Sequence, residues 1–172
     1  MDFTEVIKNR ESIRNFDPAK PLLREILDRI LDAGRIAPSA VNGQPWTFLL
    51  ISSPEMLEKI RTCYHREWFK DAPHVLVVKG SRKKAWVRTS DGYNSLETDL
   101  AIVMDHLVLA AENEGVANCW IAAFNYSQLR QVLGLTEDEE VFAMTPLGYP
   151  KADFRKKGNK TRKPRSEIVQ YI

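Results

Sequence analysis

Two short basic motifs lie near the two ends of the chain. The first runs from Arg10 through Ser12 to Arg14, and the second places Lys160 and Arg162 on either side of one threonine. Arginine offers a planar fork of donors to phosphate oxygens, and serine adds a short neutral donor. Each motif alone arises often by chance, and an isolated surface arginine is more often a solvated charge than a ligand. Together the two motifs could hold a phosphate group.

The cysteine and histidine side chains show no spacing typical of a metal site. Cys63 and Cys119 lie far apart, and His65, His74 and His106 include no i, i+4 pair. We interpret both cysteines as small buried hydrophobes. A core hydrogen bond is enough to explain His106, and no metal is expected.

The composition is that of one folded globular domain, with 172 residues of which 44% are hydrophobic and 28% charged. The net charge of +2 is too small to indicate a nucleic-acid or membrane partner. The most apolar run, 100–111, is interrupted by Asp105 and His106 and is shorter than the ~20 residues that span a bilayer. Because the chain does not open with a basic and then apolar signal peptide, we expect a cytoplasmic protein.

Hydrophobic spacing predicts alternating helices and strands. Helices are expected over 3–7, 26–33, 54–68, 95–114 and 126–133, and strands over 46–51, 74–79, 117–121 and 141–148. The helix over 95–114 is apolar around most of its circumference, which predicts burial on several sides at the centre of a domain or a dimer. Gly115 is expected to end it. This alternation is typical of an α/β or α+β sandwich of layers.

The segment 151–172 differs in character from the rest of the chain. Residues 151–165 carry eight Lys or Arg and one acid, Asp153. The segment then closes with four apolar or aromatic residues, Ile168, Val169, Tyr171 and Ile172. Apolar residues at an exposed terminus seek a surface to cover, so we predict an arm that wraps a partner subunit. A solvated terminus is the alternative interpretation of the basic part.

Five motifs follow one another along the chain in a recognisable order. They are 10–14, the run Pro38-Ser39-Ala40-Val41-Asn42-Gly43-Gln44-Pro45-Trp46, and 119–124, 147–150 and 160–164. In this order and at this spacing the chain resembles the nitroreductase family of FMN enzymes over nearly its whole length. The pattern Pro-Ser-x-x-Asn-x-Gln-Pro-Trp is its most specific piece.

The resemblance implies an α+β protein with a nitroreductase-like three-layer α/β/α sandwich around a central mixed, mostly antiparallel sheet. It also implies an intertwined homodimer in which each of two FMN molecules lies at the subunit interface. Residues 1–172 would form a single FMN-binding domain, with 151–172 as its basic tail and C-terminal arm. Trp46, Trp120 and Phe124 are expected to be core aromatics at strand ends.

The resemblance also assigns a set of cofactor-binding residues. The FMN phosphate and ribityl chain would be held by one group that joins both ends of the chain: Arg10, Ser12, Lys160 and Arg162, with Glu11 in the same segment. A loop from the partner subunit would meet the flavin with Pro38, Ser39, Ala40 and Asn42. The segment facing ring atom N5 would be Ile121, Ala122 and Ala123.

The resemblance gives Arg14 an electronic role near the pyrimidine edge of the flavin. Two-electron reduction puts negative charge near N1 and O2, and a fixed cation there stabilises the reduced form. No side chain is expected to act as a catalytic acid, base or nucleophile, because the flavin supplies the redox chemistry. The pair Ala122-Ala123 departs from larger family members, which often carry an acid and a glycine there.

The expected activity is that of an FMN-dependent NAD(P)H oxidoreductase of the nitroreductase or quinone reductase type. NADH or NADPH would give hydride to N5 and leave, and a small acceptor such as a nitroaromatic or a quinone would then occupy the same pocket in a ping-pong cycle. Because no Gly-x-Gly-x-x-Gly turn follows a strand, a separate dinucleotide-binding domain is not expected. Two alternatives stay open: a flavin-binding storage or sensor protein without turnover, and a nucleic-acid binder that uses the basic tail without a recognised motif.

Overall fold

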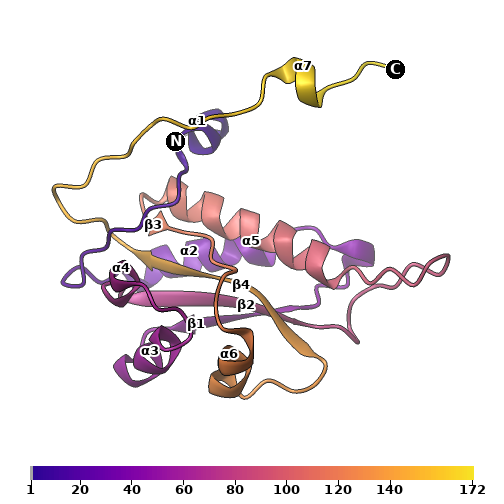
Figure 1. Cartoon of the computed structure of the whole chain (residues 1–172), viewed down its shortest axis with the longest axis horizontal. Coiled ribbons are helices and arrows are strands. Elements are labelled where there is room, and N and C mark those ends of the chain that lie inside the picture. Colours follow the sequence, from indigo (N-terminus) through magenta and orange to yellow (C-terminus); the bar gives the residue numbers. More distant parts are fainter. Residues whose placement is uncertain (1) are drawn as a thin grey trace.

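The computed structural model describes residues 2–172 (Figure 1). Its helices are α1 (Phe3–Asn9), α2 (Arg24–Arg35), the 3-10 turn η1 (Ala40–Asn42), α3 (Pro54–Arg61), α4 (Glu67–Lys70), α5 (Leu96–Asn113), α6 (Tyr126–Leu133) and α7 (Arg165–Ile168). Its strands are β1 (Trp46–Ile51), β2 (His74–Ser81), β3 (Ala117–Asn118) and β4 (Glu139–Gly148).

The four strands form one sheet in the order β1-β2-β4-β3. All the pairings described for residues 2–172 are antiparallel, so the parallel component expected of a mixed sheet is not found within this single chain. The register places Trp46 opposite Gly80 and His74 opposite Leu147, and it shifts at a bulge between Val78 and Lys79. The α+β class predicted from the sequence is confirmed.

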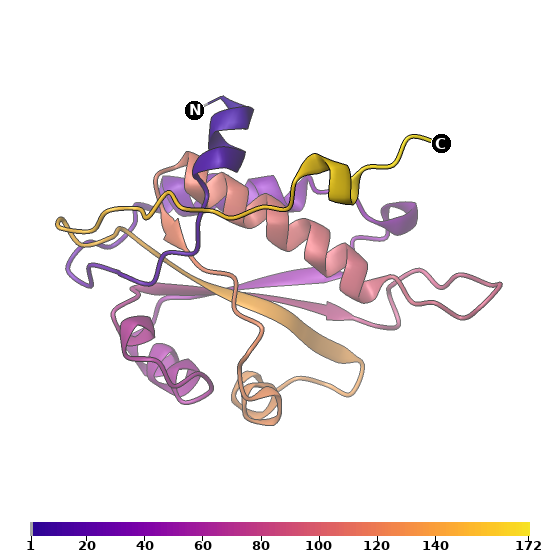
Figure 2. The same cartoon turned by 45° about the horizontal axis from the view of Figure 1, so that its top comes forward.

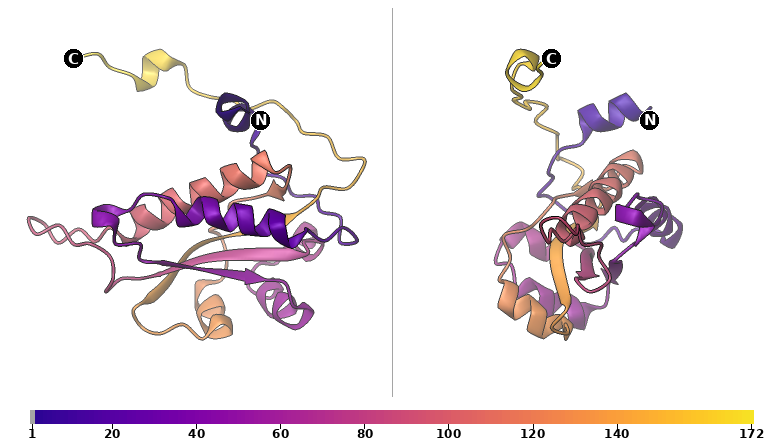
Figure 3. Two further views of the ribbon diagram at one scale, coloured as in Figure 1. Left: turned by 180° about the vertical axis from the view of Figure 1, so that it is seen from behind. Right: turned by 90° about the vertical axis from the view of Figure 1, so that its right-hand side faces the viewer.

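Helices cover both faces of the sheet, which confirms the three-layer arrangement (Figures 1 and 3). Side chains of a strand point alternately to its two faces, and β2 shows this directly. Leu76 and Val78 belong to the core cluster formed with α2 and α5. Val75 and Val77 belong to a second cluster with residues of α3 and α6. Because β2 is buried on both faces, it reads in the sequence as a continuous valine-rich run.

One predicted helix proved to be two. The helix expected over 54–68 ends at Arg61, and the short helix α4 starts only at Glu67. The Thr62 hydroxyl donates to the carbonyl of Lys59 at 2.7 Å, and the carbonyl of Cys63 accepts from the N–H of Asn125 at 2.8 Å. Because the Cys63 carbonyl is bonded to a residue far along the chain, it does not continue the helical hydrogen-bond pattern.

The bounds of the long helix α5 agree closely with the prediction, whereas its burial on several sides is not found in the single chain. It spans Leu96–Asn113, and Gly115 follows with a positive φ of 71°, where a residue without a Cβ is favoured. One side of α5 packs on the sheet and α2, while Asp105 on its outer side is exposed in the single chain.

Both ends of the chain lie away from the sheet on the side of α5 (Figure 2). After β4 the chain runs in an extended path past α1 to the short helix α7. Its last apolar residues are strongly exposed, with Ile168 at 66% and Tyr171 at 83%. This is the segment for which the sequence predicts an arm on a partner subunit.

Candidate flavin site

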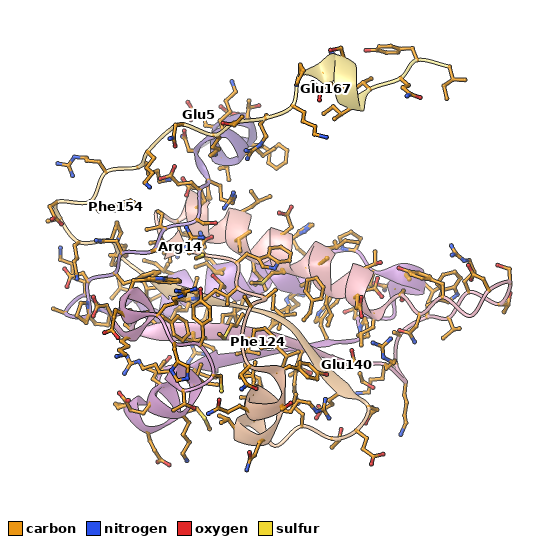
Figure 4. The ribbon with its side chains drawn as sticks, in the orientation of Figure 1. Glu5, Arg14, Phe124, Glu140, Phe154 and Glu167 are labelled. Atoms are coloured by element: carbon orange, nitrogen blue, oxygen red, sulfur yellow. The ribbon has the colours of Figure 1, made fainter. Side chains whose placement is uncertain are left out.

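Two of the four predicted phosphate-binding residues, Ser12 and Lys160, line one cavity of about 530 Å³. Its wall combines the segment after α1 with the tail: Glu11, Ser12, Arg14, Asn15, Phe154, Lys157, Asn159 and Lys160. Figure 4 shows Arg14 beneath the extended tail that carries Phe154. The two basic motifs at opposite ends of the sequence therefore meet, as predicted.

Backbone and carboxylate contacts hold the two walls of this cavity in place. The N–H of Ile13 donates to the carbonyl of Asn118 at 2.9 Å, which ties the first wall to the edge strand β3. The carboxylate of Glu11 accepts from the backbone N–H groups of Lys157 at 3.1 Å and Gly158 at 3.4 Å. Glu11 was predicted to bind the cofactor, and here its carboxylate joins the tail to the N-terminal segment.

The cavity carries more positive charge than the Glu11 carboxylate in its wall can balance, because Arg14, Lys157 and Lys160 line it as well. Four predicted cations take part in none of the ion pairs within residues 2–172: Arg10, Arg14, Lys160 and Arg162. Burial lowers the pKa of Lys160, and the charges of Arg10 and Arg162 lower it further. These two arginines therefore act on the cavity although they do not line it. An anion bound there would relieve this repulsion.

Lys160 also has a structural partner. Its ammonium group donates to the carbonyl of Lys8 and, at 3.5 Å, to that of Ile7. Both carbonyls lie in the last turn of α1, where a cation is favoured. Lys160 thus fixes the tail against α1.

Arg14 connects the cavity to a pair of aromatic side chains. Its guanidinium lies over the ring of Trp68, 6.0 Å from the ring centroid, and Trp68 in turn contacts Tyr64 edge-on at 5.8 Å. Burial raises the pKa of the Cys119 thiol, and the nearby charge of Arg14 partly offsets this. Cys119 is buried, as expected.

The segment predicted to face flavin N5 begins next to Cys119. Ile121 exchanges two backbone hydrogen bonds with Met144, at 2.9 and 3.0 Å, so its N–H is already used. The strand predicted over 117–121 is correspondingly reduced to Ala117–Asn118 and this one bridge. Ala122 and Ala123 are exposed, and their N–H groups donate to no acceptor within residues 2–172.

A second cavity, of about 410 Å³, opens beside Ala123. The turn between α3 and α4 supplies most of its lining, which comprises Cys63, Tyr64, His65, Arg66, Ala123 and Asn125. The sequence interpretation missed this turn because it continued a helix through it. The exposed side chains of His65 and Arg66 are therefore additional candidates for contact with a ligand at this end of the site.

The predicted loop from Pro38 to Asn42 lies elsewhere in the chain. It is anchored to Asp99 in the first turn of α5, whereas the basic cavity is tied to Glu112 in the last turn. At about 1.5 Å per residue, these two points are about 20 Å apart along the helix. Figure 1 shows the two regions at opposite ends of α5. A single chain therefore brings together the basic cluster and residues 121–123 but leaves the loop apart.

Of the helices within residues 2–172, none has the length and apolar character needed to cross a membrane. The same residues contain no group of three or more His, Cys, Asp and Glu placed to hold a metal ion.

Comparison with known proteins decides the family. The model of the Nitroreductase family matches residues 7–63 and 59–149. The chain belongs to the nitroreductase family. A relative from Methanothermobacter thermautotrophicus, provisionally named NADH dehydrogenase/NAD(P)H nitroreductase, is 32% identical over 160 residues, which cover 87% of this chain and 78% of the relative.

Solved structures agree with this nitroreductase assignment. A nitroreductase family protein from Clostridium difficile 630 superposes with a TM-score of 0.91 at 34% identity, over 99% of this chain and 98% of that one. A protein from Exiguobacterium sibiricum, provisionally named a nitroreductase and solved in complex with FMN, superposes with a TM-score of 0.86 over 100% and 98% of the two chains. Because its identity is 22%, this second likeness shows the shared fold alone.

Proposed function

We propose that this nitroreductase family member is an FMN-dependent NAD(P)H oxidoreductase that works as a homodimer. The observation that carries the proposal is the cationic cavity, which Arg14, Trp68 and Tyr64 link to the second cavity beside Ala123. A dianionic phosphate suits the first region, and a planar ring with hydrogen-bond acceptors suits the second. The cavity of about 530 Å³ is also within the usual range for cofactor sites.

The residues of this chain divide the binding task. Ser12 and Lys160 would contact the phosphate directly, and Arg10 and Arg162 would add attraction from behind them. The free N–H groups of Ala122 and Ala123 would meet the flavin ring near N5. When bound, FMN supplies the redox chemistry, with hydride from NADH or NADPH received at N5 and the electrons passed on to a small acceptor such as a nitroaromatic or a quinone.

Arg14 would hold positive charge beside the pyrimidine edge of the ring. Its contact with Trp68 fixes the guanidinium without neutralising it. A cation there stabilises negative charge that develops on reduction. The nicotinamide and the acceptor would use, in turn, the cavity beside Ala123, whose rim carries His65 and Arg66. The name of the Methanothermobacter relative, which includes NAD(P)H nitroreductase, supports a nicotinamide donor.

The homodimer is proposed from surfaces that a single chain leaves uncovered. A groove of about 450 Å³ between α1 and the outer side of α5 has a largely apolar lining that includes Phe3, Val6 and Leu109. Phe3 is 70% exposed, which is unusual for so large an apolar side chain. A second copy placed on this groove could bring its Pro38–Asn42 loop to the flavin of the first. A single domain over 1–172 and a cytoplasmic location stay part of the proposal.

The experiment is an anaerobic titration of the FMN-loaded protein. NADH and NADPH are added in separate runs while flavin absorbance is followed, and nitrofurazone or a quinone is then added. Bleaching followed by recovery supports the oxidoreductase. Bound flavin that never bleaches favours storage or sensing. A protein that takes up no FMN refutes the cofactor assignment.

A further inference from the structure

The loop from Ser39 to Gln44 has a strained backbone. Val41, Asn42 and Gln44 have φ angles of 48°, 56° and 45°, and they are the only non-glycine residues with positive φ within residues 2–172. Left-handed conformations carry a steric penalty for residues with a Cβ, most of all for a β-branched residue such as Val41. Val41 is 75% exposed, so side-chain packing does not compensate. Such strain persists only where other contacts enforce it.

Hydrogen bonds inside the loop close the turn but do not attach it to the body. The N–H of Gln44 donates to the Ser39 hydroxyl oxygen at 3.0 Å, and the N–H of Gly43 donates to the carbonyl of Ala40 at 2.9 Å. Attachment comes at two points. The N–H of Ala40 donates to Oδ1 of Asp99 at 2.8 Å, and the carbonyl that follows the loop, on Pro45, accepts from Ser81.

Asp99, which accepts from the N–H of Ala40, is buried in the interior. Its side chain is 2% exposed and lies in the first turn of α5, where the helix N-terminus favours negative charge. Its Oδ2 accepts from the hydroxyl of Ser95 at 2.7 Å, and Ser95 is itself 3% exposed. Both carboxylate oxygens therefore have a donor. A buried carboxylate retains its donors because losing one leaves charge without compensation.

The loop held in this way leaves the polar hydrogens of two side chains without an acceptor within residues 2–172. The Ser39 oxygen already accepts from Gln44, so its O–H proton is free to be donated elsewhere. The Asn42 Oδ1 accepts from the Gln44 side-chain amide at 3.1 Å, which leaves the NH₂ group of Asn42 as a donor. Two donors are therefore uncommitted within residues 2–172, on a loop in which Asn42 is exposed and which lies apart from the basic cavity of its own chain.

We infer that Asp99 is a positioning residue for the flavin site of the partner subunit. By fixing the N–H of Ala40 it selects the strained turn in which Ser39 and Asn42 can donate to the cofactor held by the other chain. The inference rests on the proposed function. Asp99 lies at the opposite end of α5 from the cationic cavity, and it acts on the cofactor only through the loop.

The first measurement is FMN affinity, by fluorescence quenching, for the wild type, D99A and E97Q. Glu97 lies in the same turn of α5 with its side chain 71% exposed, so E97Q removes a charge from the helix N-terminus without touching the loop. We expect D99A to weaken FMN binding about tenfold or more and E97Q to change it less than about twofold. D99N, which keeps one acceptor for Ala40, should lie between them.

A mixed dimer separates positioning across the interface from a general folding defect. One subunit carries D99A, the other carries R10A and R162A, and two different affinity tags allow the mixed dimer to be purified. If Asp99 serves the partner's site, each mixed dimer regains one tight FMN site, because one site then has both an intact loop and an intact cationic cavity. If Asp99 serves its own chain, or if D99A merely unfolds the protein, no tight site returns.

The outcomes separate a failure of the proposed function from a failure of this inference. A wild-type protein that binds no FMN refutes the proposed function and this inference with it. Tight binding by the wild type, with D99A and E97Q indistinguishable or with no tight site in the mixed dimer, refutes the inference alone.

Discussion

The contact between Lys156 and Glu112 holds the tail in position and can be tested by K156M. The Lys156 ammonium donates to the Glu112 carboxylate and, at 3.1 Å, to the carbonyl of Asn9. The Glu112 side chain is 5% exposed and that of Lys156 38%. Removing the ammonium therefore leaves a buried carboxylate without its cation, whereas removing the carboxylate leaves an ammonium that can turn to solvent.

The size of the effect follows from this asymmetry. Breaking a fully buried pair costs about 3–5 kcal/mol, and losing a hydrogen bond to a charged group costs about 1.5–3 kcal/mol. Since Lys156 is partly exposed, water can reach the Glu112 carboxylate once the tail moves, and we expect K156M to lose about 2 kcal/mol. For a chain of this length that lowers Tm by about 4–8 °C. FMN affinity should fall as well, because the following tail residues line the cationic cavity.

The assay is thermal and urea unfolding of K156M, E112M and the double variant. We expect E112M to lose less than K156M and the double variant to lie within about 1 kcal/mol of the wild type, because two apolar side chains leave no charge buried. K163M is the matched control, since Lys163 is an exposed tail residue outside the ion pairs of residues 2–172. Equal losses for K156M and K163M, or a double variant less stable than K156M, would contradict this reasoning.

Three further predictions concern charge and pH. R14Q should lower the two-electron potential of the bound flavin by on the order of 30 mV in a dye-equilibration titration, because a cation no longer faces the reduced ring; an unchanged potential would place Arg14 away from it. The pKa of Lys160 is lowered below its ordinary value of 10.5. The ratio of FMN affinity to riboflavin affinity should fall as pH rises through this pKa, because only the charged ammonium attracts the phosphate. K160R should keep the ratio constant. Burial lowers the pKa of His74, which accepts from the N–H of Leu22, so the unfolded chain takes up a proton first. The free energy of unfolding should therefore fall as pH drops below 6.5, by at most about 1.4 kcal/mol per pH unit. H74N should flatten the dependence of Tm on pH, and a flat dependence in the wild type would exclude this role of His74.

Local signals in the sequence were sufficient for several elements. The helix predicted over 126–133 has those bounds, with the Asn125 side chain accepting from Gln128 at its start and Gly134 at φ 60° after its end. The strand over 46–51 is also confirmed. In both cases the deciding groups are neighbours in the sequence.

Long-range contacts explain where the local signals failed. The helix over 54–68 breaks because the carbonyl of Cys63 bonds to Asn125, which no local pattern indicates. β4 starts at Glu139, two residues before its prediction, where Lys79 and Arg82 form ion pairs with Glu139 and Glu140. Charged residues at a strand start do not resemble a buried strand until their partners are known.

The candidate site, too, was predicted only in part. The order of motifs predicted that the two basic segments meet, and Ser12, Arg14 and Lys160 do line one cavity. The supporting residues Asp99 and Glu112 were missed. The available signal was an acid among the apolar residues of the predicted central helix, because a charge buried there needs a specific partner.

Native mass spectrometry of the protein loaded with FMN tests the central claim most directly, because the claim joins cofactor binding to two chains. We predict a dimer that carries two FMN and releases them when it separates into monomers. A monomer that retains FMN, or a stable dimer that binds none, would contradict the account.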